Sequence, residues 1–140
     1  MKYDICVFGG CSIDAFYYQK EDMTFGETAD KFEAGGKGAN QAVASARAGA
    51  KVVMLSRLGN DELGQKIKQN LLDNNVDTQF IEMVDGLNND FSKIYVTKID
   101  GANDIVRFNG AIDSFYPEMV EKYKHIILNS KFVVKFLYRV

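Results

Sequence analysis

The chain has 140 residues, of which 46% are hydrophobic, and its 17 Lys and Arg residues against 19 Asp and Glu residues leave a net charge of −2. This length allows one globular domain with a sizeable core and leaves no room for a second full domain. A balanced charge without a basic cluster argues against a nucleic-acid partner, because phosphates bind to concentrated Lys and Arg surfaces, and it disfavours a membrane surface for the same reason.

The start of the chain does not resemble a targeting segment. Asp4 stands where a secretory signal peptide would carry its apolar region, and no apolar run is long enough to cross a bilayer. We therefore expect a cytoplasmic protein. The two cysteines, Cys6 and Cys11, and the single histidine, His125, lack the spacing of a zinc site, so we expect no metal centre in this chain.

The first elements alternate between buried and exposed types. Residues 5–8 form a short apolar run that Gly9 ends, which is typical of a strand covered on both faces. Residues 15–20 and 28–34 are polar and aromatic and flank a turn signal at Gly26, which predicts two exposed strands. The sequence therefore predicts one central strand followed by two strands outside the core.

A helix, a strand and a second helix follow. Residues 39–48 are rich in alanine and end at Gly49, which predicts a helix with a glycine stop. Residues 52–55 form another buried strand, and Asn60 or Asp61 can cap a helix whose apolar positions are Leu63, Ile67, Leu71 and Leu72. This βαβα order predicts an α/β fold with a parallel sheet and right-handed crossovers.

The second half of the chain has a different character. Residues 79–84, 92–99 and 105–108 read as strands between clusters of Gly, Asn and Asp, and we interpret them as a small antiparallel sheet. A short helix is expected at about 116–124, with a proline near its start. Residues 132–134 then resemble another central strand.

Several chemically active residues cluster at two points of this predicted fold. Some follow the first strand and the others precede the first long helix. In open α/β sheets, the carboxyl ends of the strands and the amino ends of the helices face one crevice, where ligands bind. The candidate substrate-binding residues are therefore Ser12, Asp14, Gly35, Gly36, Lys37 and Asn40.

These residue types suit a polyol. The carboxylate of Asp14 accepts hydrogen bonds from two hydroxyls, Asn40 offers an acceptor and two donors, and Lys37 adds three donors. Consecutive glycines let backbone amides approach a ligand, and a helix amino end adds a partial positive field. Spacing alone also allows a plainer interpretation, in which the glycines form a tight turn, Lys37 is solvated and Asp14 caps a local turn.

Two other glycine motifs are excluded. A Walker A loop fails because Lys31 stands at its first glycine and Gly38 at its Ser or Thr position. A dinucleotide fingerprint starting at the glycine pair after the first strand meets Cys11 or Ser12 at its second glycine. The chain therefore carries neither a P-loop nor a Rossmann cofactor site.

Residues 35–42, Gly-Gly-Lys-Gly-Ala-Asn-Gln-Ala, resemble the first signature of the ribokinase or PfkB-type carbohydrate kinase family and are closest to ribokinases. Three further matches follow in family-like order: Gly26-Glu27-Thr28, Ala48-Gly49-Ala50 and the Leu-Gly-Asn-Asp-Glu-Leu-Gly segment at 58–64. The resemblance runs from about Tyr3 to about Val134.

The resemblance implies that residues 1–140 are the amino-terminal part of a ribokinase-like domain. It implies a doubly wound parallel sheet with a small β-sheet lid from strands around 15–34 and 91–108. It implies ATP-dependent phosphorylation of a sugar hydroxyl, with ribose as the first candidate, and a homodimer formed through the lid. The family positions that contact sugar hydroxyls match Asp14, Gly35, Gly36, Lys37 and Asn40. Ser12 stands where ribokinases usually have asparagine, which leaves the identity of the sugar open.

The family features for phosphoryl transfer are missing from these residues. The second signature, a Gly-Ala-Gly-Asp turn that carries the base and the anion hole, is absent, and residues 101–104 (Gly-Ala-Asn-Asp) read as a hairpin turn. The family also places a sugar-binding glutamate after the last strand, whereas residues 135–140 contain none. We therefore expect no catalytic residue in this chain.

We interpret the chain as a truncated form that holds only the sugar-binding half and is inactive alone. The resemblance implies ATP, Mg²⁺ and a candidate monovalent cation as cofactors of the full-length kinase, and none is expected to bind this chain tightly. Two alternatives stay open: a non-catalytic module for sugar binding or lid dimerisation, and a fragment without a function.

Overall fold

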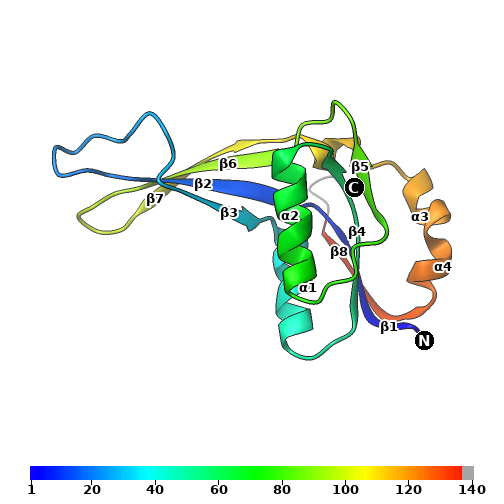
Figure 1. Ribbon diagram of the computed structural model, residues 1–140. Helices are drawn as coiled ribbons and strands as arrows, with labels where there is room; N and C mark the ends of the chain where they lie inside the picture. The colour runs from blue at the N-terminus through cyan, green and yellow to red at the C-terminus, as the bar shows by residue number, and fades with distance from the viewer. Residues whose placement is uncertain (137–140) are drawn as a thin grey trace.

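The computed structural model describes residues 1–136, which fold into two four-stranded sheets. The first, called the main sheet below, contains β1 (Tyr3–Gly9), β4 (Val52–Gly59), β5 (Ile81–Val84) and β8 (Ser130–Phe136) in the order β5-β4-β1-β8. The second, the outer sheet, contains β2 (Ser12–Tyr18), β3 (Lys31–Gly35), β6 (Asp90–Val96) and β7 (Asn103–Phe108) in the order β3-β2-β6-β7. The outer sheet projects from the body of the molecule (Figure 1).

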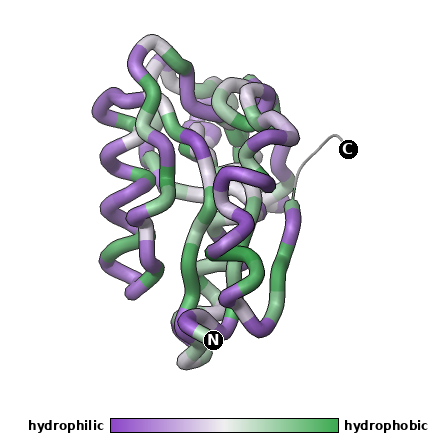
Figure 2. The backbone as a smooth tube through the Cα atoms, turned by 90° about the vertical axis from the view of Figure 1, so that its right-hand side faces the viewer, coloured by the Kyte–Doolittle hydropathy of each residue, from purple (hydrophilic) through white to green (hydrophobic). Residues whose placement is uncertain are grey.

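The main sheet is parallel throughout and lies between two layers of helices, as the βαβα order predicted. The helices are α1 (Lys37–Arg47) and α2 (Glu62–Asp73) on one face and α3 (Glu118–Lys122) and α4 (Lys124–Ile127) on the other (Figure 1). A short 3-10 helix, η1 (Ala111–Ser114), precedes α3. Figure 2 shows the hydrophobic central strands between more hydrophilic segments. Within residues 1–136, no helix is long and apolar enough to span a membrane.

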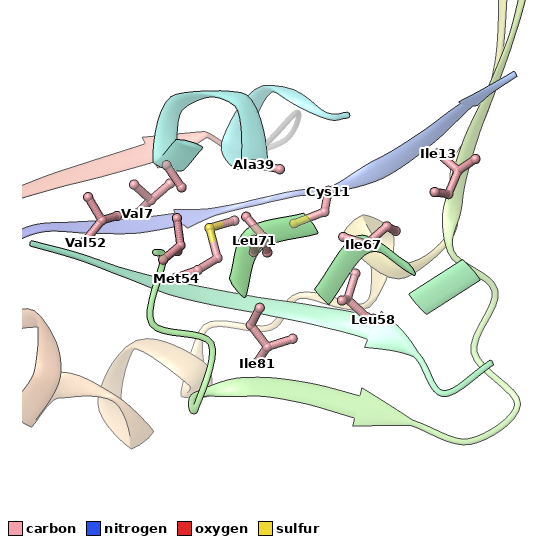
Figure 3. Close-up of a cluster of buried hydrophobic side chains, with 12 residues drawn as sticks. Val7, Cys11, Ile13, Ala39, Val52, Met54, Leu58, Ile67, Leu71 and Ile81 are labelled. Atoms are coloured by element: carbon pink, nitrogen blue, oxygen red, sulfur yellow. The ribbon is translucent and has the colours of Figure 1, made fainter. Parts of the chain in front are cut away.

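Two apolar clusters hold the layers together. On the side of α1 and α2, fully buried side chains from β1, β4 and α2 pack together (Figure 3), among them Val7, Leu58 and Leu71. The second cluster, on the side of α3 and α4, contains Tyr3 and Met119. Because β1 and β4 are covered on both faces, their sequences are nearly continuous apolar runs.

Local signals placed both long helices correctly. In α1, Ala39 and Ala42 are buried against the sheet, since small side chains allow the helix to approach closely. In α2, the Asp61 carboxylate caps the helix by accepting a hydrogen bond from the Gly64 N–H at 2.8 Å. Leu72, which we expected on the apolar face of α2, is 46% exposed.

Three sequence-based interpretations need correction. Residues 79–84 do not belong to the small sheet, because β5 pairs in parallel with β4 in the main sheet. The outer sheet is mixed rather than antiparallel, since β2 and β6 run parallel. The short helix predicted at 116–124 is split into α3 and α4 and continues to Ile127. Sheet membership and strand direction depend on contacts between distant segments, which periodicity does not encode.

Candidate functional site

A cleft of about 180 Å³ lies where the outer sheet meets the amino end of α1. The structure brings five of the six predicted site residues to this cleft: Ser12, Asp14, Gly36, Lys37 and Asn40. Gly35, the sixth, is buried directly behind it and pairs with Ser12 across β2 and β3. Two segments that are separated in sequence, at 12–14 and 35–40, therefore form one surface.

The strand β2 positions the first two of these side chains. It begins at Ser12, so Ser12 and Asp14 are alternate residues of one strand and point to the same face of the outer sheet. The Ser12 hydroxyl donates a hydrogen bond to Oδ1 of Asp14 at 3.1 Å. This bond orients the Asp14 carboxylate, whose other oxygen, Oδ2, lies against Gly35.

The environment of Asp14 disfavours its charge. Burial is the main cause that raises the pKa of the Asp14 carboxyl, and the carboxylate of Glu33, its register partner on β3, adds to the rise. The hydrogen bond from Ser12 and the positive charge of Arg107 act in the opposite direction. A half-buried carboxylate of this kind gains most from a ligand that supplies hydroxyl donors.

Two glycines make the close approach of the strands and α1 possible. A Cβ atom at Gly35 would collide with the carboxyl group of Asp14. Gly36, the N-cap of α1, has φ +92°, and a Cβ atom there would lie 2.7 Å from the Cα of Cys11. Both positions therefore require glycine. At Gly35, contact with Asp14 excludes a side chain, and at Gly36 both contact with Cys11 and the positive φ exclude one.

The helix α1 presents the remaining two polar side chains. Lys37 is its first residue, and its Nζ lies 4.9 Å from the centroid of the Phe136 ring, which also lines the cleft. Asn40 follows one turn later, and its backbone N–H donates a hydrogen bond to the carbonyl oxygen of Gly36 at 2.8 Å, which leaves the side chain to face the cleft. Both side chains are exposed and lie where the helix dipole favours oxygen ligands with partial negative charge.

Sequence reasoning missed the opposite wall of the cleft, which comes from β6, β7 and the segment after it. Asp90 and Ser92 line the cleft because they pair in register with Ser12 and Asp14. Arg107 pairs with Ser92 and lines the same wall. Asp90 and Ser92, two residues apart on β6, are a signal for this wall, but only the parallel pairing of β2 and β6 shows where these side chains point.

Asp90 stabilises the backbone of this wall. Its carboxylate accepts hydrogen bonds from the N–H groups of Gly110 at 2.5 Å and Ile112 at 3.2 Å. These bonds fix the segment between β7 and η1 at the edge of the cleft. Burial raises the pKa of the Asp90 carboxyl, and the two N–H donors act against that rise.

Cys11 lines the cleft, but its thiol is not a reactive nucleophile. Burial raises the pKa of its thiol to about 12, so the sulfur stays protonated at neutral pH. The thiol lies 3.6 Å from the hydroxyl of Ser56, which is itself buried and donates to the Gly9 carbonyl oxygen at 2.8 Å. Cys11 therefore packs the junction between β1 and β2.

Two further expectations concern the second half of the chain. Residues 101–104 do fall at a hairpin: β6 and β7 pair antiparallel, Gly101 and Ala102 lie in the connecting turn, and β7 starts at Asn103. The second expectation concerns residues 135–140, which lack the glutamate that the family places after the last strand. Residues 137–140 lie outside the described part of the chain.

Comparison with known proteins identifies the family. A family model described as pfkB family carbohydrate kinase matches residues 2–136. The chain belongs to this family. Its members' fold agrees with the structure: the chain matches "Arabidopsis thaliana Ribokinase complexed with Ribose and ATP" with a TM-score of 0.79 and 26% identity, covering 96% of this chain and 45% of the other. The doubly wound, ribokinase-like fold predicted from the sequence is thereby confirmed.

Curated relatives are similar along most of this chain. Ribokinase of Bacillus subtilis is 35% identical over 139 residues, which cover 91% of this chain and 47% of the relative. Deoxyribokinase of Salmonella typhi is 32% identical over 123 residues, covering 85% of this chain and 40% of the relative. The chain thus spans less than half the length of these sugar kinases.

Proposed function

We propose that this chain supplies the sugar-binding part of an ATP-dependent sugar kinase, with ribose as the first candidate substrate. The observation that carries the proposal is the convergence of Asp14, Lys37 and Asn40 on one cleft at the amino end of α1. Membership of the pfkB family and similarity to a ribokinase support the reaction class. Similarity to a deoxyribokinase keeps 2-deoxyribose as the second candidate.

Each residue has a distinct role in this proposal. Asp14 accepts hydrogen bonds from sugar hydroxyls, and Ser12 holds its carboxylate in place. Asn40 and Lys37 donate from the helix side. Gly35 and Gly36 let the start of α1 pack closely against β2, because a Cβ atom at either position would collide with Asp14 or with the backbone of Cys11.

We further propose that the outer sheet is a lid that pairs with the lid of a second copy. Tyr18 and Ile105 lie on the same face of the sheet as Asp14 and are 44% and 46% exposed; Ile105 lines the cleft and Tyr18 lies beyond it. A second copy would cover these apolar side chains. Sedimentation equilibrium tests this directly, and a monomer at all concentrations would contradict it.

The residues that bind ATP and Mg²⁺ and that abstract the hydroxyl proton are proposed to lie outside this chain. Among residues 1–136, no group of three or more His, Cys, Asp or Glu side chains is placed to hold a metal ion. We therefore assign no step of phosphoryl transfer to the described side chains. The cytoplasmic location expected from the sequence stays a prediction.

Titration calorimetry of the purified chain with D-ribose tests the sugar site. We expect binding by the unchanged chain and a loss of at least about 100-fold in affinity in Asp14→Ala, because removal of one partner leaves the sugar hydroxyls without a charged acceptor. Asp104→Ala is the matched control, since Asp104 is exposed and lies on the other face of the outer sheet. Absence of ribose and 2-deoxyribose binding by the folded chain would contradict the proposal.

A parallel assay addresses the predicted inactivity. The chain is incubated with ribose, ATP and Mg²⁺, and we expect no phosphorylated sugar. Turnover that is lost in Asp14→Ala would show that the phosphoryl-transfer residues are present in the chain and would overturn that part of the proposal.

A further inference from the structure

Arg107 belongs to a row of four side chains that crosses the outer sheet. In register, Glu33 on β3 lies opposite Asp14 on β2, Asp14 opposite Ser92 on β6, and Ser92 opposite Arg107 on β7. Directly opposed residues of neighbouring strands point to the same face of a sheet. Arg107 therefore faces the cleft from the wall opposite Lys37 and Asn40, and it lines that cleft.

The protein does not use this guanidinium to hold itself together. Within residues 1–136, Arg107 is exposed and takes part in no ion pair within 4.0 Å and no hydrogen bond. The other two arginines in the described part differ. Arg47 donates to Asn74 at 2.8 Å, and Arg57 donates to Glu82 at 3.0 Å and to the Ser114 carbonyl oxygen at 2.7 Å.

The β2 side of the cleft is short of donors. Asp14 is an acceptor when ionised, and the hydroxyl of Ser12 is already directed at it. Lys37 and Asn40 supply donors only from the helix side. A planar guanidinium with five N–H groups on the outer sheet complements this arrangement, because it can donate to sugar oxygens that the helix does not reach.

We propose that Arg107 is a specificity-determining residue that donates hydrogen bonds to a sugar hydroxyl oxygen on the side of the ring facing the outer sheet. This inference rests on the proposed function and adds a contact on the wall that sequence reasoning missed. A site built to hydrogen-bond a particular hydroxyl discriminates strongly against analogues that lack it, since its polar groups then stay unpaired. Arg107 thus decides which hydroxyl pattern the site accepts.

The test uses calorimetry of the 140-residue chain with D-ribose and its 1-, 2-, 3- and 5-deoxy analogues. We expect Arg107→Leu to weaken ribose binding by at least about 10-fold. One analogue should bind the unchanged chain and Arg107→Leu equally well, because it lacks the hydroxyl that Arg107 contacts. Arg107→Lys should recover only part of the loss, since an ammonium keeps the charge but not the planar fork.

Lys93→Leu is the matched control. Lys93 is the neighbour of Ser92 on β6 but points to the other face, where its Nζ lies 5.8 Å from the centroid of the Phe108 ring. Its replacement removes one positive charge from the same sheet at a residue that does not itself line the cleft, so ribose affinity should stay within about twofold. Far-ultraviolet circular dichroism verifies that each variant is folded.

The outcomes separate the two proposals. Equal ribose affinity in Arg107→Leu and the unchanged chain would overturn the role of Arg107 and leave the sugar site standing. The same fold-loss for ribose and for every deoxy analogue would also overturn it, because that pattern indicates a general effect on the site. Absence of ribose binding by the unchanged, folded chain would refute the proposed function and this inference with it.

Discussion

The main sheet and the outer sheet are built from the same number of strands but use them differently. In the main sheet, β1 and β4 are covered by helices on both faces, and residues 52–55 are at most 1% exposed. In the outer sheet, all six residues of β7 are exposed. The first therefore contributes most of the stability, whereas the second presents polar side chains to the cleft. The following predictions test this division.

The largest effect is expected from a cavity in the main sheet. Leu58 on β4 is fully buried, so Leu58→Ala should lower the free energy of unfolding by about 3–4 kcal/mol through lost burial and an unfilled cavity. Val106→Ala on β7 is the matched control at 46% exposure and should cost less than about 0.5 kcal/mol. Urea denaturation measures both. Comparable costs would show that the two sheets contribute equally.

The next effect concerns the junction between the sheets. Gly36→Ala should destabilise the chain by about 2–3 kcal/mol, because the new Cβ atom meets the backbone of Cys11 and the residue keeps a positive φ. Gly86→Ala separates these two causes, since Gly86 has φ +74° but nothing within 4 Å of a Cβ atom. If both variants lose the same stability, close packing at Gly36 contributes nothing.

The smallest effect is a gain in stability from a substitution at Asp14 in the cleft. Burial raises the pKa of the Asp14 carboxyl above its ordinary value of 3.8. Between that value and the raised pKa, the folded state binds more protons than the unfolded state, so stability falls as pH rises through this window. Asp14→Asn removes this cost and should stabilise the chain by about 0.5–1 kcal/mol at pH 7.

Thermal denaturation of both proteins across pH measures this gain. It should disappear below pH 3.8, where Asp14 is protonated in both states. The pKa of Asp90 is raised as well, so the difference between variant and unchanged chain isolates Asp14. A variant that is less stable at pH 7 would show that the hydrogen bond from Ser12 outweighs the burial of the charge.

Local signals in the sequence determined the order of the elements and one side of the site. The apolar run at 52–55 and the alanine-rich helix that ends before Gly49 encode their own structure, because burial and helix termination act over a few residues. The same holds for Asp14 and residues 35–40: a strand end and a helix start in an α/β fold share one crevice, so their proximity follows from the fold class.

The tertiary structure alone decided which strands lie side by side. The apolar residues at 79–84, followed by a Gly, Asn and Asp cluster at 85–90, mark a strand but do not show that it extends the main sheet beside β4. The parallel pairing of β2 with β6 joins segments about 78 residues apart in the chain, from Ser12 to Asp90, and brings Ser92 opposite Asp14. The pairing of β6 with β7 then places Arg107 opposite Ser92. Such pairings depend on packing of the whole molecule, because each strand's backbone can bond to many partners.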